Sequence, residues 1–267
     1  MLSPSQRFHR SAGFTLIEMV MVVTLLGIIG FISTMVILMP LQVGMGMEQR
    51  GRMVDNADLA LAQLSHELRS ALPHSVQIHD GAKHLEFIPV VAAGRYRRTG
   101  AGKSLDINDN HGIFDVIGPA IDIDHDDLVI SIYNTSLDGH NVYDGENIAE
   151  VVELIPTGSS TSIQYDSGTL STHSPAQRFY LFKAPGPVSY RCSLKDGKLS
   201  RYTGYPRSPS DESPNLGEGT SSLLLTGLTS CEFEYTDNLG LVTISFTVDN
   251  GSEGFKLSTK VAIVNSP

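Results

Sequence analysis

The residue of this chain with the clearest potential for chemistry is Glu18, a lone carboxylate near the start of a long apolar segment. Between Phe14 and Met39 no other side chain is ionisable. An acid inside a bilayer costs about 2.5–3.5 kcal/mol even on the lenient insertion scale, so it calls for a partner. A carboxylate that snorkels toward the interface, favoured by the positive end of the helix, is the alternative that the residue types leave open.

The apolar segment at residues 14–39 has the length of a membrane helix, because about 20 apolar residues span the hydrocarbon core. An ordinary secretory signal has a shorter apolar region, followed by a small-x-small cleavage site, and no such site follows here. Arg7 and Arg10 precede the segment and favour a cytoplasmic N-terminus. The sequence therefore predicts a single pass through the inner membrane, with the rest of the chain in the periplasm.

Residues 13–18, GFTLIE, resemble letter for letter the consensus of the type IV prepilin family, which includes major pilins, minor pilins and the pseudopilins of type II secretion. The resemblance implies that the prepilin peptidase cuts between Gly13 and Phe14, removes a leader of residues 1–13 and N-methylates Phe14. It also implies that Glu18 docks the subunit by pairing with the Phe14 amine of a neighbouring subunit. That pairing would supply the partner that the buried acid needs.

The family resemblance also implies the partners and the location of the chain. The expected partners are the prepilin peptidase, other minor pilins, the major pilin and an inner-membrane assembly platform. The expected location is the inner membrane and then a pilus fibre on the cell surface. A nucleic-acid partner is not expected, because the formal net charge is −10. The only local basic candidate, formed by Arg95, Arg97, Arg98 and Lys103, is ordinarily explained as a solvated strand end and loop.

The helix is expected to continue beyond the membrane, over residues 14–72 in total. Five apolar residues recur at helical spacing and form one face: Ala57, Leu61, Leu64, Leu68 and Leu72. Pro73 predicts the end of the helix. Pro40, Gly44 and Gly46 weaken a helix interior and predict a kink or a locally melted stretch.

Residues 73–267 are expected to form one β-rich head, so the predicted fold class is α+β, a long pilin helix packed on an antiparallel sheet. Turn residues at 237–240 and 249–254 predict a three-strand meander over 231–264. The Pro-, Ser- and Gly-rich stretch at 205–219 predicts an exposed loop. Eight strands are expected: 84–91, 128–133, 178–182, 188–192, 198–202, 231–236, 241–248 and 255–264.

Cys192 and Cys231 are the only cysteines of the chain. The predicted periplasmic location favours a disulfide between them, with two unpaired buried thiols as the alternative. No Cys-x-x-Cys occurs, so a metal site is not expected from these residues.

The head carries a second resemblance, in residues 187–192 (PVSYRC) and 199–205 (LSRYTGY). Together with the chain length, these residues resemble the O-type minor pilins of the mannose-sensitive haemagglutinin (MSHA) pilus. The larger J-type pseudopilins of type II secretion also bear long β-rich heads on the same helix. The resemblance implies a low-abundance pilin that helps to start or complete an adhesive pilus.

Other chemistry receives little support from the residue patterns. Asp106, Asn108 and Asn110 alternate like the oxygen ligands of a calcium loop. Ile117 stands where such a loop needs a bidentate Glu, so calcium is only a weak candidate ligand. No cofactor is expected. The residue spacing matches no catalytic motif, so the chain is not expected to be an enzyme.

Three functional hypotheses follow from the sequence. The leading one is a minor pilin that acts through helix packing and head contacts with other pilins. The nearest alternative is a J-type pseudopilin of a type II secretion system. The third is an adhesin or a DNA-uptake tip subunit that uses the head as a receptor.

Overall fold

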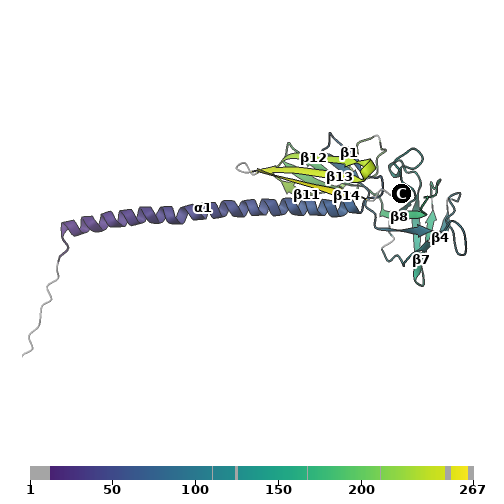
Figure 1. Cartoon of the computed structure of the whole chain (residues 1–267), viewed down its shortest axis with the longest axis horizontal. Coiled ribbons are helices and arrows are strands. Elements are labelled where there is room, and N and C mark those ends of the chain that lie inside the picture. Colours follow the sequence, from purple (N-terminus) through teal and green to yellow (C-terminus); the bar gives the residue numbers. More distant parts are fainter. Residues whose placement is uncertain are drawn as a thin grey trace, which may run out of the picture. The chain divides into compact units, whose positions relative to one another are not determined.

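The structure is a computed structural model that describes residues 13–263, apart from 110, 124–125, 167, 211 and 250–253. The chain divides into two compact units at residues 54 and 55, and each unit is treated separately below. Figure 1 shows one long helix and a β-rich head, so the fold class is α+β, as predicted.

Helix α1 extends over Leu16–Arg69 without interruption, 54 residues in all. It begins two residues later and ends three residues earlier than the predicted range of 14–72. The expected melted stretch at Pro40, Gly44 and Gly46 is wrong, because all three residues are helical. A proline removes one helical hydrogen bond, and two glycines cost about 1 kcal/mol each, which is too little to end a long cooperative helix.

The C-terminal part of α1 belongs to the second unit and buries one face there. Ala57, Leu64 and Leu68 of the predicted apolar face are at most 4% exposed, which confirms most of it. Leu61, which was also predicted, is only half-buried, and Ala60 is buried in addition. Glu67, on the flank of this face, forms an ion pair with Arg201, whose Nε lies 2.9 Å from the Glu67 carboxylate. The last turn closes with a bond of 2.7 Å from the Ser70 hydroxyl to the Glu67 carbonyl.

Two antiparallel sheets make up one part of the head. The first sheet has five strands in the order β1-β2-β9-β10-β11: β1 (Gln77–His79), β2 (His84–Phe87), β9 (Val188–Ser193), β10 (Lys198–Thr203) and β11 (Thr220–Thr226). The second sheet is the predicted meander: β12 (Leu228–Thr236), β13 (Leu241–Asp249) and β14 (Gly254–Ala262).

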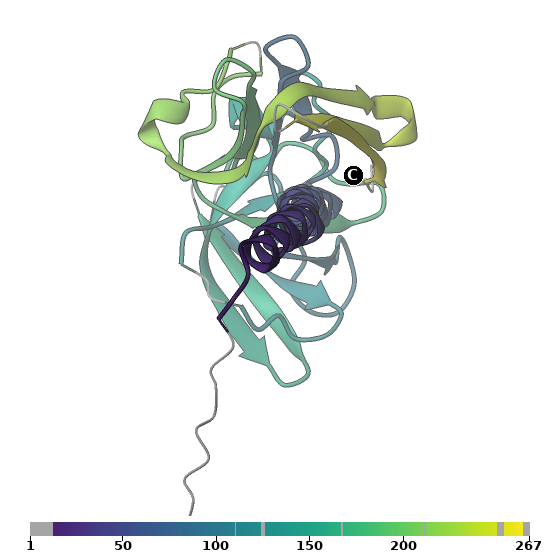
Figure 2. The same cartoon turned by 90° about the vertical axis from the view of Figure 1, so that its left-hand side faces the viewer.

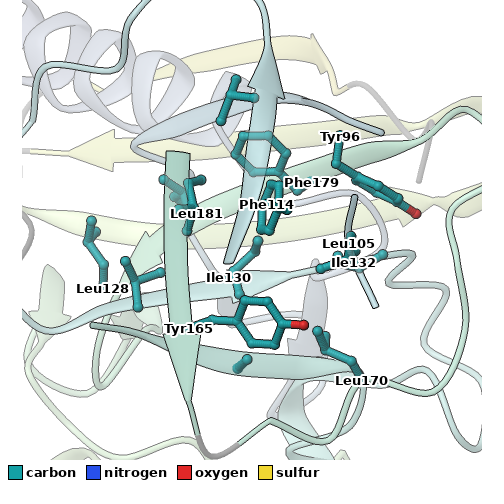
Figure 3. Packing of buried hydrophobic residues seen from close by; sticks show 14 residues of the cluster. Tyr96, Leu105, Phe114, Leu128, Ile130, Ile132, Tyr165, Leu170, Phe179 and Leu181 are labelled. Carbon is teal, nitrogen blue, oxygen red and sulfur yellow. The ribbon is translucent and has the colours of Figure 1, made fainter. Parts of the chain in front are cut away.

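The remaining six strands close into a barrel in the order β3-β4-β7-β6-β5-β8. Their bounds are β3 (Ala92–Tyr96), β4 (Gly112–Ile117), β5 (Leu128–Ser131), β6 (Ile148–Thr157), β7 (Ser160–Asp166) and β8 (Arg178–Lys183). The interior is filled by aromatic and branched side chains that point toward one another, among them Phe114, Phe179 and Ile130 (Figure 3). The rings of Phe114 and Phe179 meet edge to face at 5.6 Å, so the barrel encloses a packed core.

The barrel is an insertion into the five-stranded sheet. Strands β2 and β9 pair directly, with Phe87 opposite Val188, although all six barrel strands lie between them in the sequence. Figure 2 shows the teal barrel strands as a group separate from the yellow-green C-terminal strands. A second apolar cluster of residues from both parts joins them: Leu72, Ile88, Val129, Val142, Tyr143 and Phe182.

All eight predicted strands are present within about four residues of their expected bounds, and Val264 at the end of the last one lies outside the described residues. The six strands that were not predicted are β1, β3, β4, β6, β7 and β11. Four of these strands are short or carry residues that are rare in strands, such as Gly94 in β3 and Pro156 in β6, whereas β7 and β11 have seven residues each without Gly or Pro.

The expected exposed loop at 205–219 is partly wrong. Tyr205 is fully buried, and the guanidinium of Arg207 lies 5.6 Å from the centre of the Phe182 ring. The Ser210 backbone N–H donates to Asp144 at 3.1 Å. The start of this segment is therefore anchored to the barrel side of the head, because a Tyr and an Arg can bury apolar surface while their polar ends find partners.

Candidate processing and assembly site

The start of α1 is organised by Thr15. The Thr15 hydroxyl accepts a hydrogen bond from the Glu18 backbone N–H at 3.3 Å, and the Thr15 carbonyl accepts from the same N–H at 3.1 Å. Thr-x-x-Glu at a helix start is the spacing of a capping box, in which the hydroxyl satisfies one of the unpaired N–H groups of the first turn. The cap explains why the helix begins at Leu16 and leaves Gly13 and Phe14 outside the helix.

The predicted cleavage site is accessible in this arrangement. Phe14 is 78% exposed, and a Cβ built on Gly13 would have no atom within 4 Å. A peptidase must hold its substrate in extended form. If the helix began before Gly13, the peptide bond between Gly13 and Phe14 would be part of the helix and could not be cleaved. Gly13, Phe14 and Glu18 therefore lie together at an exposed helix start, and their individual roles stay predictions. Residues 1–12 of the predicted leader, with Arg7 and Arg10, lie outside the described residues.

Glu18 lies in the first turn of the helix, one turn from the Phe14 backbone nitrogen in sequence. Within the described part of the chain, no side chain pairs with its carboxylate. A carboxylate in the first turn is stabilised by the helix dipole, yet it still lacks a counter-charge in an apolar surrounding. The arrangement can bind one cationic group, and an amine of another chain meets that requirement.

The segment at 16–34 is long and apolar enough to cross a membrane. Its large apolar side chains are exposed to between 45% and 83%, with Leu16 the most exposed. Such a surface is unstable in water, so lipid tails or partner helices must cover it. This segment lies within the predicted span of 14–39.

The two cysteines are joined. Cys192 of β9 and Cys231 of β12 form a disulfide with their Cα atoms 6.4 Å apart. The bond links the five-stranded sheet to the meander. Two backbone hydrogen bonds reinforce this link through the turn between β1 and β2: Cys192 N–H donates to the Lys83 carbonyl at 2.9 Å, and Phe233 N–H donates to the Ala82 carbonyl at 2.8 Å.

The weak calcium candidate is only partly described. Asp106 Oδ1 accepts from the Asn108 backbone N–H at 2.9 Å, which forms a local turn, and Asn110 lies outside the described residues. The nearby Asp115 carboxylate accepts from the Lys103 backbone N–H and from Ser162, both at 2.8 Å, and these bonds hold its pKa below the usual value. No group of three or more His, Cys, Asp or Glu in the described ranges could hold a metal ion. Calcium binding there stays a prediction.

The candidate basic residues lie at one end of the barrel. Arg95 is in β3, and Arg97 and Arg98 follow the strand. Arg97 and Lys103 both act on Asp115, and their charges help to lower its pKa. The structure adds a cation that the sequence did not group with them, because Arg178 of β8 lies directly opposite Arg95.

A buried polar network in the five-stranded sheet was missed by the sequence analysis. Glu86 is 2% exposed and accepts a hydrogen bond from the Tyr205 hydroxyl at 3.0 Å, while His79 Nε2 lies 3.1 Å from its other oxygen. Ser189 Oγ lies 2.6 Å from Tyr205 and 2.7 Å from His84 Nε2. Because side chains alternate along β2, His84 and Glu86 lie on the face opposite the apolar one. From the sequence, polar residues on that face would be expected to contact solvent.

Burial controls the ionisation of this network. Desolvation, and then the neighbouring His79, lowers the pKa of His84 to about 4. Desolvation and the nearby Glu86 raise the pKa of Tyr205 far above its usual value. A serine beside a histidine can be a nucleophile, but Ser189 is fully buried, so a substrate has no access to it. The network therefore serves the fold of the head.

Comparison with known proteins gives one family-level match. Residues 8–34 match the model of the prokaryotic N-terminal methylation motif. No curated protein and no solved structure matches the chain. The match covers the predicted cleavage site, the capped helix start and the membrane-spanning segment, and such a motif implies processing by a prepilin peptidase and assembly with other pilins. The methylation motif, at the start of an apolar helix, supports the identification of the chain as a type IV pilin-like or pseudopilin protein.

Proposed function

We propose that this chain is a minor pilin that helps to assemble an MSHA-type adhesive pilus. The observation that carries the proposal is the helix start, where Thr15 caps the first turn and the Glu18 carboxylate has no partner within the described chain. Cleavage after Gly13 would leave a free amine at Phe14. The capped turn then carries one cation and one anion on the same short segment.

The proposed assembly step follows from those two charges. In the low dielectric of a packed helix bundle, the Glu18 carboxylate attracts the Phe14 amine of a neighbouring subunit far more strongly than it would in water. An unpaired acid in that surrounding is costly, so only the register that joins the two charges is favourable. The ion pair thus selects the axial position of each helix in the bundle.

The MSHA assignment rests on the head. The two motifs that resemble O-type minor pilins lie on adjacent strands, β9 and β10, and contribute Cys192 to the disulfide and Tyr205 to the buried network. These residues specify how the head folds. They support a head of this type, and the pilus system to which it belongs remains part of the proposal.

A J-type pseudopilin of a type II secretion system is the second candidate. The large head, with a barrel inserted into the sheet, favours it because J-type pseudopilins also carry long β-rich heads. Cross-linking in native membranes followed by mass spectrometry separates the two. Major and minor pilins of an adhesive pilus as cross-linked partners would support the first proposal, and secretion pseudopilins would support the second.

The first experiment is mass spectrometry of the chain from native membranes with and without the prepilin peptidase. We expect an N-methylated peptide that begins at Phe14 only when the peptidase is present. An intact leader in the presence of the peptidase would contradict the proposal.

The second experiment tests the role of Glu18 in assembly. We expect Glu18→Gln to be cleaved normally and to be lost from sheared fibres. Asp58→Asn is the matched control, because it removes one exposed acid from the same helix. Equal incorporation of both variants would exclude the proposed docking role.

A further inference from the structure

We propose that the outer face of the barrel carries a binding site for an acidic polysaccharide, built on the arginine pair Arg95 and Arg178. The inference is independent of which fibre the chain enters. It starts from the strand register, because β3 and β8 are antiparallel and place Arg95 directly opposite Arg178. Like charges directly opposite each other on a sheet face destabilise the pair, so this arrangement costs the fold free energy instead of supporting it.

The two arginines lie beside a groove. A shallow groove of about 340 Å³ is lined by Ala93, Gly94, Arg95, Arg178, Phe179 and Tyr180. None of these lining residues is acidic. A Cβ at Gly94 would lie 2.7 Å from Cζ of Phe179, so a larger residue there would clash with the buried barrel core beneath the groove. The groove is therefore open and positively charged on a protein whose formal net charge is −10.

The charge of Arg95 is not compensated by its surroundings. Its side chain is exposed, and within the described residues it forms no ion pair or hydrogen bond. Arg97 and Lys103, in contrast, share the carboxylate of Asp115. Arg178 forms a hydrogen bond with the Tyr180 side chain, which also lines the groove. Two guanidinium groups on neighbouring strands can hold one carboxylate or sulfate group through charge-assisted hydrogen bonds.

The same observations favour a polysaccharide over a nucleic acid. A nucleic-acid strand carries a phosphate about every 3.4 Å, so a bound strand would bring several phosphates to a groove that offers only two arginines. Single-stranded nucleic acids also bind through exposed aromatic rings. Tyr180 is only partly exposed and packs against the cluster that joins barrel and sheet. A polymer with sparse anionic groups and neutral hydroxyls fits a two-arginine groove better.

The test uses the full-length chain in a neutral detergent, with immobilised polygalacturonate and dextran sulfate as probes. We expect the wild-type chain to bind both and to ignore neutral dextran. Arg95→Gln should weaken binding at least tenfold, and Arg95→Lys should weaken it less, because lysine keeps the charge but loses the planar fork. Lys256→Gln, an equal change of charge on exposed strand β14, should remain within twofold of wild type.

Three results would overturn the proposal. The first is no binding to either acidic polysaccharide. The second is an equal loss in Lys256→Gln, which would mean that binding follows net charge alone. The third is tighter binding of single-stranded DNA than of both polysaccharides with the same loss in Arg95→Gln, which would assign the groove to nucleic acid. Because Arg95 is exposed, its substitution leaves the barrel core intact even where Arg178→Gln fails to fold.

Discussion

At the scale of single residues, Thr15 determines where the long helix begins. Its hydroxyl is the side-chain acceptor for the Glu18 N–H. We expect Thr15→Ala to destabilise the first turn by about 1 kcal/mol, because the Glu18 N–H loses its side-chain acceptor and keeps only the Thr15 carbonyl. Amide hydrogen exchange in detergent micelles should show about fivefold faster exchange at Glu18.

The control for this prediction is Thr24→Ala. Thr24 is also an exposed threonine of α1, but its hydroxyl donates to the Met21 carbonyl inside the helix and caps nothing. Unchanged exchange at Glu18 in this control is expected. If both alanine variants accelerate exchange equally, the cap has no special role.

His84 makes the stability of the head depend on pH. Burial, followed by the charge of His79, lowers its pKa from 6.5 to about 4, while Asp80 opposes the shift and Arg191 adds to it. The folded state therefore resists protonation more than the unfolded state does. The contribution of neutral His84 to the free energy of unfolding is fully present above pH 6.5. It is lost as the pH falls toward 4, and the total loss is about 3 kcal/mol.

Urea unfolding between pH 7.5 and pH 4 measures this effect. We expect the wild-type midpoint to fall steeply over this range and His84→Gln to show a shallower slope, since glutamine does not titrate. His66→Gln, an exposed helix position, is the control and should keep the wild-type slope. Parallel curves for the wild type and His84→Gln would show that other groups cause the dependence.

At the scale of elements, the disulfide joins two sheets that share no paired strand. Cys192 and Cys231 are 39 residues apart in the chain. Closing a loop of this length stabilises the fold by about 4 kcal/mol on the chain-entropy model. We expect the double variant Cys192→Ser, Cys231→Ser to lower the unfolding free energy by about that amount in urea.

Reduction supplies the control for that prediction. Dithiothreitol should destabilise the wild-type chain to the level of the double serine variant and should leave the variant unchanged. A wild-type chain that keeps its stability after full reduction would show that the packing between β9 and β12 holds the two sheets without the covalent bond.

The sequence predicted best the elements whose patterns are local. The helix was predicted because its apolar residues recur at helical spacing, and the strands of the meander were predicted because they alternate and end in Asx- and Gly-rich turns. Strand β3, with the sequence AAGRY, was missed because nothing local distinguishes it from a loop. It is a strand because it fills the gap between β4 and β8 in a closed barrel.

The candidate sites differ in the same way. The N-terminal site was predictable because its chemistry lies within six consecutive residues. The buried network around Glu86 was not, because Tyr205, Ser189 and His84 come from three separate segments of the chain. The pairing of Arg95 with Arg178 was equally hidden, because 82 intervening residues separate partners that only the barrel register brings together.

At the scale of the whole molecule, the chain combines a processing and assembly segment with a head that contains an inserted barrel. The insertion begins and ends at neighbouring points, because Phe87 and Val188 are register partners in the sheet. Partner residues in an antiparallel sheet are only about 5 Å apart, so a short linker can replace the barrel without stretching the sheet.

We expect a variant in which a short Gly-Ser linker replaces residues 92–183 to separate the two activities. Cleavage after Gly13 should continue, because the matched methylation motif ends at residue 34, long before the deletion. Binding to polygalacturonate should disappear with Arg95 and Arg178. The variant should also be less stable, since Leu72 and Ile88 lose the barrel residues that cover them.

The same preparation can be analysed for both outcomes, by the mass of the Phe14 peptide and by retention on the polysaccharide. A second deletion variant that also carries Ile88→Thr reduces the newly exposed apolar surface and distinguishes aggregation from a true loss of processing. An intact leader in both deletion variants would mean that the peptidase needs the barrel, and retained polysaccharide binding would place the anion site outside it. Normal processing with lost binding would show that the peptidase does not need the inserted barrel and that the anion site lies within it.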